Sequence, residues 1–311
     1  MVQALFGERR LRSAVTVVAL AVVASASGQA LAGDKAGGPP TSIGAISVLS
    51  NRGDLISGGD ALVRIDLGDA AAASVKVTLN GADVTSAFAV RENGRFEGLV
   101  TGLQVGQNVL VARPEGGYGR QVAIRNHPIG GPVFSGPQVT PFFCNPNASN
   151  PPLGTAIDAQ CNAPTRVELL YRNTATPPQF VPYDPASPPP AASIAQTTTD
   201  AGATVPFIVQ RVTGTANRGI YQIAVLVDPT RPIEPWSTSQ PWSRKLFHPF
   251  GGACGNQHVQ TAPGNVLQAT QLGLGFAVAT SSLNIYANNC SDLTSAEATM
   301  MTKEIVVERY G

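Results

Sequence analysis

The sequence predicts a protein in two parts, an antiparallel β-sandwich over residues 42–128 and a mixed α/β region over residues 129–311. Short alternating strand patterns separated by turn signals fill the first part. Longer apolar strand patterns, and one long helical pattern, occur only in the second part. Charged residues make up only 13% of the chain beside 32 glycines and 25 prolines, a composition typical of strands and loops rather than helical bundles.

The first 32 residues have the pattern of a secretory signal peptide. Residues 9–12 contain three arginines, residues 14–24 form an apolar run, and residues 30–32 read Ala-Leu-Ala, a cleavage pattern. The run is about half of the ~20 residues that span a bilayer, which argues against an uncleaved anchor. The paired arginines raise the twin-arginine route, but we favour the general secretory route. We therefore expect a periplasmic or extracellular protein, free of the membrane after cleavage.

A linker rich in glycine and proline occupies residues 33–41 and precedes the predicted sandwich. Residues 61–67 alternate apolar and polar side chains, as one face of a half-buried strand requires. The dipeptides Asn80-Gly81 and Asn93-Gly94 are strong hairpin-turn signals. Six or seven such strands within about 85 residues indicate a sandwich of immunoglobulin-like (Ig-like) type.

The chain has four cysteines, Cys144, Cys161, Cys254 and Cys290. An oxidising compartment favours two disulfides among them, and four cysteines allow three connectivities. We favour sequential pairing: the first pair closes a loop rich in proline and asparagine, and the second joins loops that follow neighbouring strands. The chain has no C-x-x-C and only three histidines, so we expect no structural zinc, no other metal and no cofactor.

Strand patterns in the second part become longer and more apolar. The run at residues 219–227 is almost continuously apolar, as in a strand buried on both faces. Further strands are predicted at residues 166–171, 205–212, 245–250 and 276–280.

The last segment has helical period. Thr294 and Glu297 have the spacing of a capping box, and Gly311 has the position of a helix-ending glycine. The apolar positions that share one face of this helix are Leu293, Ala296, Met300 and Val307.

The order of these elements matches the first half of an α/β-hydrolase: an antiparallel strand pair, a strand that ends in a glycine-rich loop, another strand, and a long helix. The loop spans residues 248–255. In hydrolases, glycines at this point let backbone N–H groups approach the substrate oxyanion, which makes Gly251, Gly252 and Ala253 oxyanion-hole candidates. The alternative is a tight turn that holds a disulfide cysteine.

Several segments of the second part resemble a family of secreted bacterial proteins of unknown function, which pairs an N-terminal Ig-like region with an α/β-hydrolase-like region. The resemblance covers nearly all of the mature chain. The segments that carry it are residues 219–226, 245–255, 275–284, 289–292 and 295–304.

The resemblance implies that a strand and a nucleophile elbow of type G-x-S-x-G follow the long helix. The 311 residues contain no G-x-S-x-G, and Ser135 lies in a proline-rich loop without the required preceding glycine. We therefore expect an N-terminal fragment, truncated before the nucleophile elbow, that has no catalytic residue and is itself inactive. Its strand at residues 276–280 would lie at an open sheet edge.

Two functional hypotheses follow. The first is an N-terminal fragment of a secreted α/β-hydrolase-family protein that hydrolyses a small-molecule or polymeric ester when complete. The alternative is a non-catalytic secreted β-rich binding module. A formal net charge of +1 without a basic tract excludes nucleic acid as the expected partner.

Other signals are weaker. Arg52-Gly53-Asp54 spells an adhesion tripeptide, but a turn before a strand explains it. His258 follows the glycine-rich loop and could face a cleft or solvent. Tyr183, Trp236 and Trp242 could line a polymer-binding surface, although aromatic side chains in such loops more often pack as small clusters.

Overall fold

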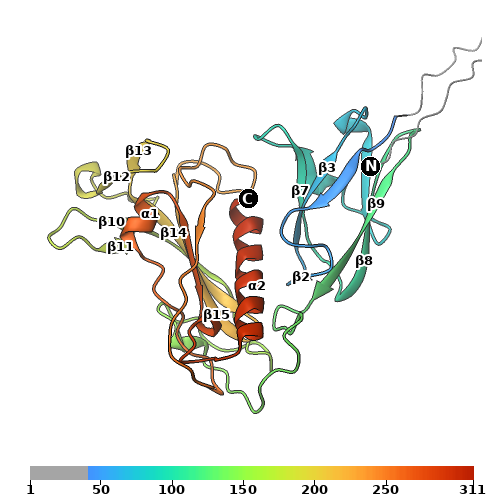
Figure 1. The fold of residues 1–311 in the computed structure, drawn as a ribbon. Coiled ribbons are helices and arrows are strands. Elements are labelled where there is room, and N and C mark those ends of the chain that lie inside the picture. Colours follow the sequence, from blue (N-terminus) through green and yellow to red (C-terminus); the bar gives the residue numbers. More distant parts are fainter. Residues whose placement is uncertain (1–40) are drawn as a thin grey trace, which may run out of the picture. The chain divides into compact units, whose positions relative to one another are not determined.

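The computed structural model describes residues 41–311 (Figure 1). The predicted signal peptide, and the predicted linker up to residue 40, lie outside the described residues. No described helix is long and apolar enough to cross a membrane.

The strands of the first part form two sheets. The four-stranded sheet has the order β1 (Ala45–Val48), β3 (Ala61–Asp66), β7 (Phe96–Val100) and β6 (Phe88–Val90). The five-stranded sheet has the order β2 (Ile56–Ser57), β9 (Arg120–His127), β8 (Gly106–Pro114), β4 (Val75–Leu79) and β5 (Ala82–Asp83).

One apolar core lies between these two sheets. Val63 and Ile65 of β3 contribute from the first sheet, and Leu110 and Ala112 of β8 from the second, each at most 2% exposed. In both strands the core residues are two positions apart, the strand periodicity that the sequence pattern predicts. The Ig-like type of this sandwich, and the domain boundary at residue 128, stay predictions.

The second part is built on a six-stranded sheet. Its order is β11 (Phe180–Pro182), β10 (Arg166–Arg172), β14 (Ile208–Ala216), β15 (Gly219–Leu226), β17 (Ala277–Ser281) and β16 (Leu246–Phe247). A separate hairpin joins β12 (Gln196–Thr198) to β13 (Thr204–Pro206). Short 3-10 turns occur at Ala72–Ser74, Thr85–Ala87, Pro146–Ala148, Ala191–Ser193 and Ser282–Asn284.

Strand β15 is buried along its whole length, as its continuous apolar sequence predicts. Ile223 and Val225 point to the face covered by the long helix α2 (Asp292–Tyr310). Ala224 and Leu226 point to the other face, where they share a core with Leu272 of the short helix α1 (Ala269–Gly273). The sheet therefore lies between two apolar layers, with α2 running along it in Figure 1.

Strand β17 is an interior strand, so the prediction that residues 276–280 form an open edge is wrong. It pairs antiparallel with β15 and parallel with β16. β16 takes the outer position instead, and it is only two residues long rather than the predicted six. After β16 the chain passes through Pro249, which has no backbone N–H to donate to a neighbouring strand. The loop that follows bonds to the backbone of residues 284–286 instead.

Helix α2 differs from its prediction at its cap and on its buried face. Ser291, not Thr294, is the N-cap, because its hydroxyl accepts from the Thr294 N–H. Leu293 is 59% exposed, so the predicted apolar face is wrong. Gly311 ends the helix with φ +89°, as predicted. The buried residues are Ser295, Glu297, Ala298, Met301, Thr302, Glu304, Val306 and Tyr310.

Two polar members of this face, Glu297 and Glu304, accept from distant backbone N–H groups, and hydrophobic periodicity does not predict such contacts. Glu304 accepts from the Ser57 N–H at 2.6 Å and from Asn51 Nδ2 at 3.1 Å. Burial raises the pKa of Glu304 to about 7, although these donors favour its charged form. Burial, and then the charge of Glu304, raise the pKa of Glu308 to about 9.

Because the pKa values of these two carboxyl groups are raised, we expect the free energy of unfolding to fall as pH rises. The ordinary pKa of Glu308 is 4.5, so between 4.5 and about 9 the unfolded chain has released a proton that the folded chain keeps. We expect Glu308→Gln to raise the free energy of unfolding at pH 8 by ~1.4 kcal/mol or more, the equivalent of one pKa unit. At pH 4 it should change little. Urea unfolding at pH 4, 6 and 8 measures both values.

The exposed Glu115 offers a matched control, Glu115→Gln. A Glu308→Gln variant with the same fall in stability between pH 4 and 8 as the parent protein would contradict this assignment.

Candidate active site

The candidate site lies where three chain segments meet at one end of the six-stranded sheet. Because β15 runs antiparallel to β17, with Tyr221 opposite Ser281, the turn before β15 lies beside the end of β17. β16 runs parallel to β17, so the glycine-rich loop follows it at the same end. In open α/β sheets, ligands bind outside the carboxyl ends of parallel strands.

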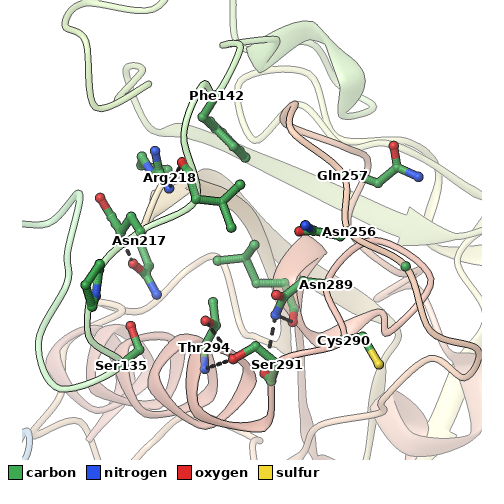
Figure 2. Close-up of a pocket in the computed structure, with 15 residues that line it drawn as sticks. Ser135, Phe142, Asn217, Arg218, Asn256, Gln257, Asn289, Cys290, Ser291 and Thr294 are labelled. Atoms are coloured by element: carbon green, nitrogen blue, oxygen red, sulfur yellow. Dashed lines mark hydrogen bonds between the residues drawn. The ribbon is translucent and has the colours of Figure 1, made fainter.

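A hollow of about 360 Å³ opens at this end of the sheet (Figure 2). Its wall is rich in amide and hydroxyl side chains and contains one charged side chain, Arg218. The polar lining residues are Ser135, Gln138, Asn217, Asn256, Gln257, Asn289, Ser291 and Thr294.

Asn217 and Arg218 form the two-residue turn between β14 and β15, with φ +51° and +63°. Asparagine tolerates this left-handed conformation, whereas arginine rarely adopts it. Arg218 Nη2 donates to the Val139 carbonyl at 3.0 Å, and the guanidinium lies 4.4 Å from the centre of the Phe142 ring. Burial lowers the pKa of Arg218. Among the described residues, Arg218 forms no salt bridge.

The glycine-rich loop lies along residues 284–290 and bonds to their backbone. Gly251 N–H donates to the Asn284 carbonyl at 3.0 Å, so this oxyanion-hole candidate is already occupied. Gly255 N–H donates to the Tyr286 carbonyl at 2.7 Å. A Cβ on Gly255 would lie 1.9 Å from the Ala287 carbonyl oxygen, so only glycine permits this approach.

Gly252 and Ala253, the other two oxyanion-hole candidates, lie in the exposed part of this loop. Within residues 41–311 neither N–H has a hydrogen-bond acceptor. Ala253 has φ +70°, which turns the chain before Cys254. Both N–H groups are therefore available to an acceptor from outside the described chain.

The structure contains both disulfides that the sequence favours, and it has no free cysteine in its described part. Cys254–Cys290 fixes the glycine-rich loop to the segment before α2, and Cys290 lines the hollow. Cys144–Cys161 closes the proline-rich loop.

None of the three histidines lines the hollow. His258 Nδ1 lies 2.8 Å from the Pro141 carbonyl, so this ring contacts a loop rather than facing the hollow. His127 Nε2 lies 3.1 Å from the Asp54 carbonyl. Both ring nitrogens of His248 are buried without a partner in the described chain, and burial lowers the pKa of His248 to about 4. No Ser–His pair therefore forms at the hollow.

Ser135 lines the hollow, but it is held by a buried carboxylate. Glu297 Oε2 accepts from the consecutive N–H groups of Val133, Phe134 and Ser135 at 2.5 to 2.9 Å. Ser135 Oγ donates to Glu297 Oε1 at 3.0 Å. Glu297 thus fixes one wall of the hollow to α2, a role that its predicted place in a capping box does not suggest.

The weaker sequence signals have local explanations. Arg52 pairs with Asp54 at 2.6 Å within the tripeptide itself. Trp236 packs under Arg91, Trp242 packs against Tyr310, and Tyr183 against Tyr171. These aromatic side chains form separate contacts. No group of three or more potential metal-ligating side chains occurs among residues 41–311.

Sequence reasoning missed the amide side chains and Arg218. The available signal was the run Ala-Asn-Arg-Gly at residues 216–219, a polar pair between two long apolar strands. Such a pair indicates a tight hairpin turn. Its position beside residues 255–257 and 289–291 depends on strand order, which the sequence pattern does not fix.

We predict that Glu297→Ala lowers the free energy of unfolding by about 2 to 4 kcal/mol, because it leaves three backbone donors without an acceptor. Glu297→Gln should lower it less, since the amide oxygen can still accept. Urea unfolding measures both variants against the exposed control Glu115→Ala. Equal stability of Glu297→Ala and the control would show that the carboxylate does not hold this wall.

We predict that the two disulfides stabilise the folded protein by different amounts. They join residues 36 and 17 positions apart. Chain entropy then assigns about 4 kcal/mol to Cys254–Cys290 and about 3 kcal/mol to Cys144–Cys161. Replacing each pair by serine and measuring unfolding in guanidinium chloride tests this order. A larger loss on removing Cys144–Cys161 would contradict it.

Comparison with known proteins places the sequence in a family. A family model described as "Tannase-like family of unknown function (DUF6351)" matches residues 46–311. No curated protein matches the chain. Because the matched residues make up well over half of the sequence, the chain belongs to this tannase-like family of unknown function.

Proposed function

We propose that this chain is exported and that residues 129–311 form the oxyanion-stabilising and substrate-binding part of an α/β-hydrolase-type protein that acts on esters or related acyl compounds. Its tannase-like family supports a hydrolase-related origin. The sheet supports the same fold, because an antiparallel strand pair precedes two parallel strands and a glycine-rich loop follows the first of these. Two disulfides suit an oxidising compartment outside the cytoplasm.

The observation that carries this proposal is the free pair of N–H groups at Gly252 and Ala253. When an ester carbonyl is attacked, negative charge develops on its oxygen, and fixed backbone donors stabilise that charge without reorganising. The neighbouring Cys254–Cys290 disulfide, and the bonds of Gly251 and Gly255, hold the loop on both sides. The hollow then receives another part of the substrate.

The proposed role does not include the nucleophile. The 311 residues contain no G-x-S-x-G, and Ser135 is bonded to Glu297 rather than to a histidine. Activation of a serine hydroxyl needs a base within hydrogen-bond reach. These residues therefore bind and polarise an acyl group, and we propose that they do not cleave it.

A second candidate function is non-catalytic binding. The amide-lined hollow without a Ser–His pair favours it. The two proposals differ in where an ester contacts the protein, at Gly252 and Ala253 or only inside the hollow.

We predict that the purified protein does not hydrolyse short-chain aryl esters above the uncatalysed rate. In amide-resolved NMR, titration with ethyl butyrate should shift the N–H signals of Gly252 and Ala253, because the ester carbonyl accepts from them. Gly116, in the exposed turn between β8 and β9, is the control position. Shifts confined to the hollow would favour the binding module. Ester turnover that is lost in Ser135→Ala would contradict our assignment of the residues.

A further inference from the structure

The hollow holds a positive charge without a counter-charge. Arg218 is its single charged lining residue, and no aspartate or glutamate lines it. The guanidinium is partly buried, and its Nε is shielded from water without a partner in the described chain. A desolvated cation needs an anion or several acceptors to offset the loss of hydration.

Two carboxylates that belong to or contact the residues around the hollow are used elsewhere. Glu297, which touches the lining residue Ser135, is saturated by three backbone N–H groups and one hydroxyl. Asp292, in the first turn of α2, accepts from the Tyr286 hydroxyl at 2.8 Å. Neither forms a salt bridge with Arg218.

A second donor beside Arg218 also lacks an acceptor. Asn217 is 3% exposed, lines the hollow, and its Nδ2 has no partner within residues 41–311. The orientation of its amide is fixed, because Oδ1 accepts from Gln138 Nε2 at 2.9 Å. Gln138 Nε2 also donates to the Gly130 carbonyl at 2.7 Å, which fixes Gln138 in turn. An unpaired buried donor costs about 1 to 3 kcal/mol, a cost that an acceptor bound beside it would offset.

We propose that the hollow binds the carboxylate of a small hydroxylated acid, of the sugar-acid class, through Arg218 and Asn217. The planar guanidinium suits a carboxylate, and a single positive charge matches a single negative one. The amides of Asn256, Gln257 and Asn289 line the rest of the wall and can both donate to and accept from hydroxyl groups. A volume of about 360 Å³ lies in the range of small-molecule sites.

This inference rests on the hollow in the proposed function, and it names the part of the substrate that the hollow selects. It does not depend on the oxyanion donors, because a carboxylate can bind at Arg218 whether or not Gly252 and Ala253 polarise an ester. A free acid therefore tests it without any reaction.

The experiment compares three probes by isothermal titration calorimetry on the purified protein: D-glucuronate, D-glucose and benzoate. Glucuronate carries both the carboxylate and the hydroxyl groups, glucose only the hydroxyls, and benzoate only the carboxylate. We expect glucuronate to bind at least ten-fold more tightly than either of the others. In NMR it should shift Asn217 and Asn289 signals.

Arg218→Met should weaken glucuronate binding ten-fold or more, and the control Arg125→Met, at an exposed position of β9, should not. Asn217→Asp keeps an oxygen for Gln138, tolerates positive φ, and replaces the free donor by a negative charge, so it should also weaken glucuronate binding ten-fold or more. Circular dichroism shows whether Arg218→Met folds. If it does not, Asn217→Asp is the variant that tests the proposal.

Three results would overturn the proposal: no glucuronate binding at tens of millimolar, equal affinity for glucose, or full affinity in both variants at the turn. Failure of the proposed function looks different. In that case Gly252 and Ala253 would not respond to ethyl butyrate, while glucuronate would still bind and depend on Arg218.

Discussion

The antiparallel pairing of β15 with β17 determines where the polar groups of the hollow lie. It places the Asn217-Arg218 turn beside the end of β17, and the parallel pairing of β16 places the glycine-rich loop at the same end. β15 is buried on both faces, so a one-residue shift of its register would move Ile223 and Val225 from the face packed on α2 to the opposite core, where their side chains would not fit the existing packing. The apolar core of the sheet thereby fixes the positions of polar residues that belong to distant parts of the sequence.

Helix α2 connects this core to the wall of the hollow, and it does so with buried polar groups. Met301 and Tyr310 pack on the sheet, while Glu297 holds the backbone of residues 133–135 and Glu304 binds Ser57. Each carboxylate replaces the water that these N–H groups would lose on burial. The helix therefore packs on the sheet with apolar side chains and binds two other segments with carboxylates. For this reason its buried face is not a continuous apolar stripe.

Local patterns predicted what depends on local chemistry. The two-faced burial of β15 and the Gly311 helix end could be predicted from residue types and spacing, and the predicted order of loops and strands favours the sequential disulfide pairing. The helix cap could not, because Ser291 and Thr294 are both good caps and the backbone decides between them. The partners of Glu297 lie more than 160 positions away, and the strand order that joins Arg218 to Asn289 is likewise non-local. Periodicity carries no information about such contacts.

The hollow and the glycine-rich loop differ from the core in how well their hydrogen-bond donors are matched by acceptors. In the core, carboxylates and N–H groups are matched, as at Glu297. At the hollow, Arg218 Nε and Asn217 Nδ2 lack acceptors within residues 41–311. In the glycine-rich loop, the N–H groups of Gly252 and Ala253 also lack them. Rigid neighbours hold these donors, since Gln138 fixes Asn217 and the Cys254–Cys290 disulfide fixes the loop. An excess of preorganised donors at the carboxyl ends of parallel strands favours oxygen-rich, negatively charged groups there, and this shared polarity links the proposed oxyanion role to the proposed carboxylate site.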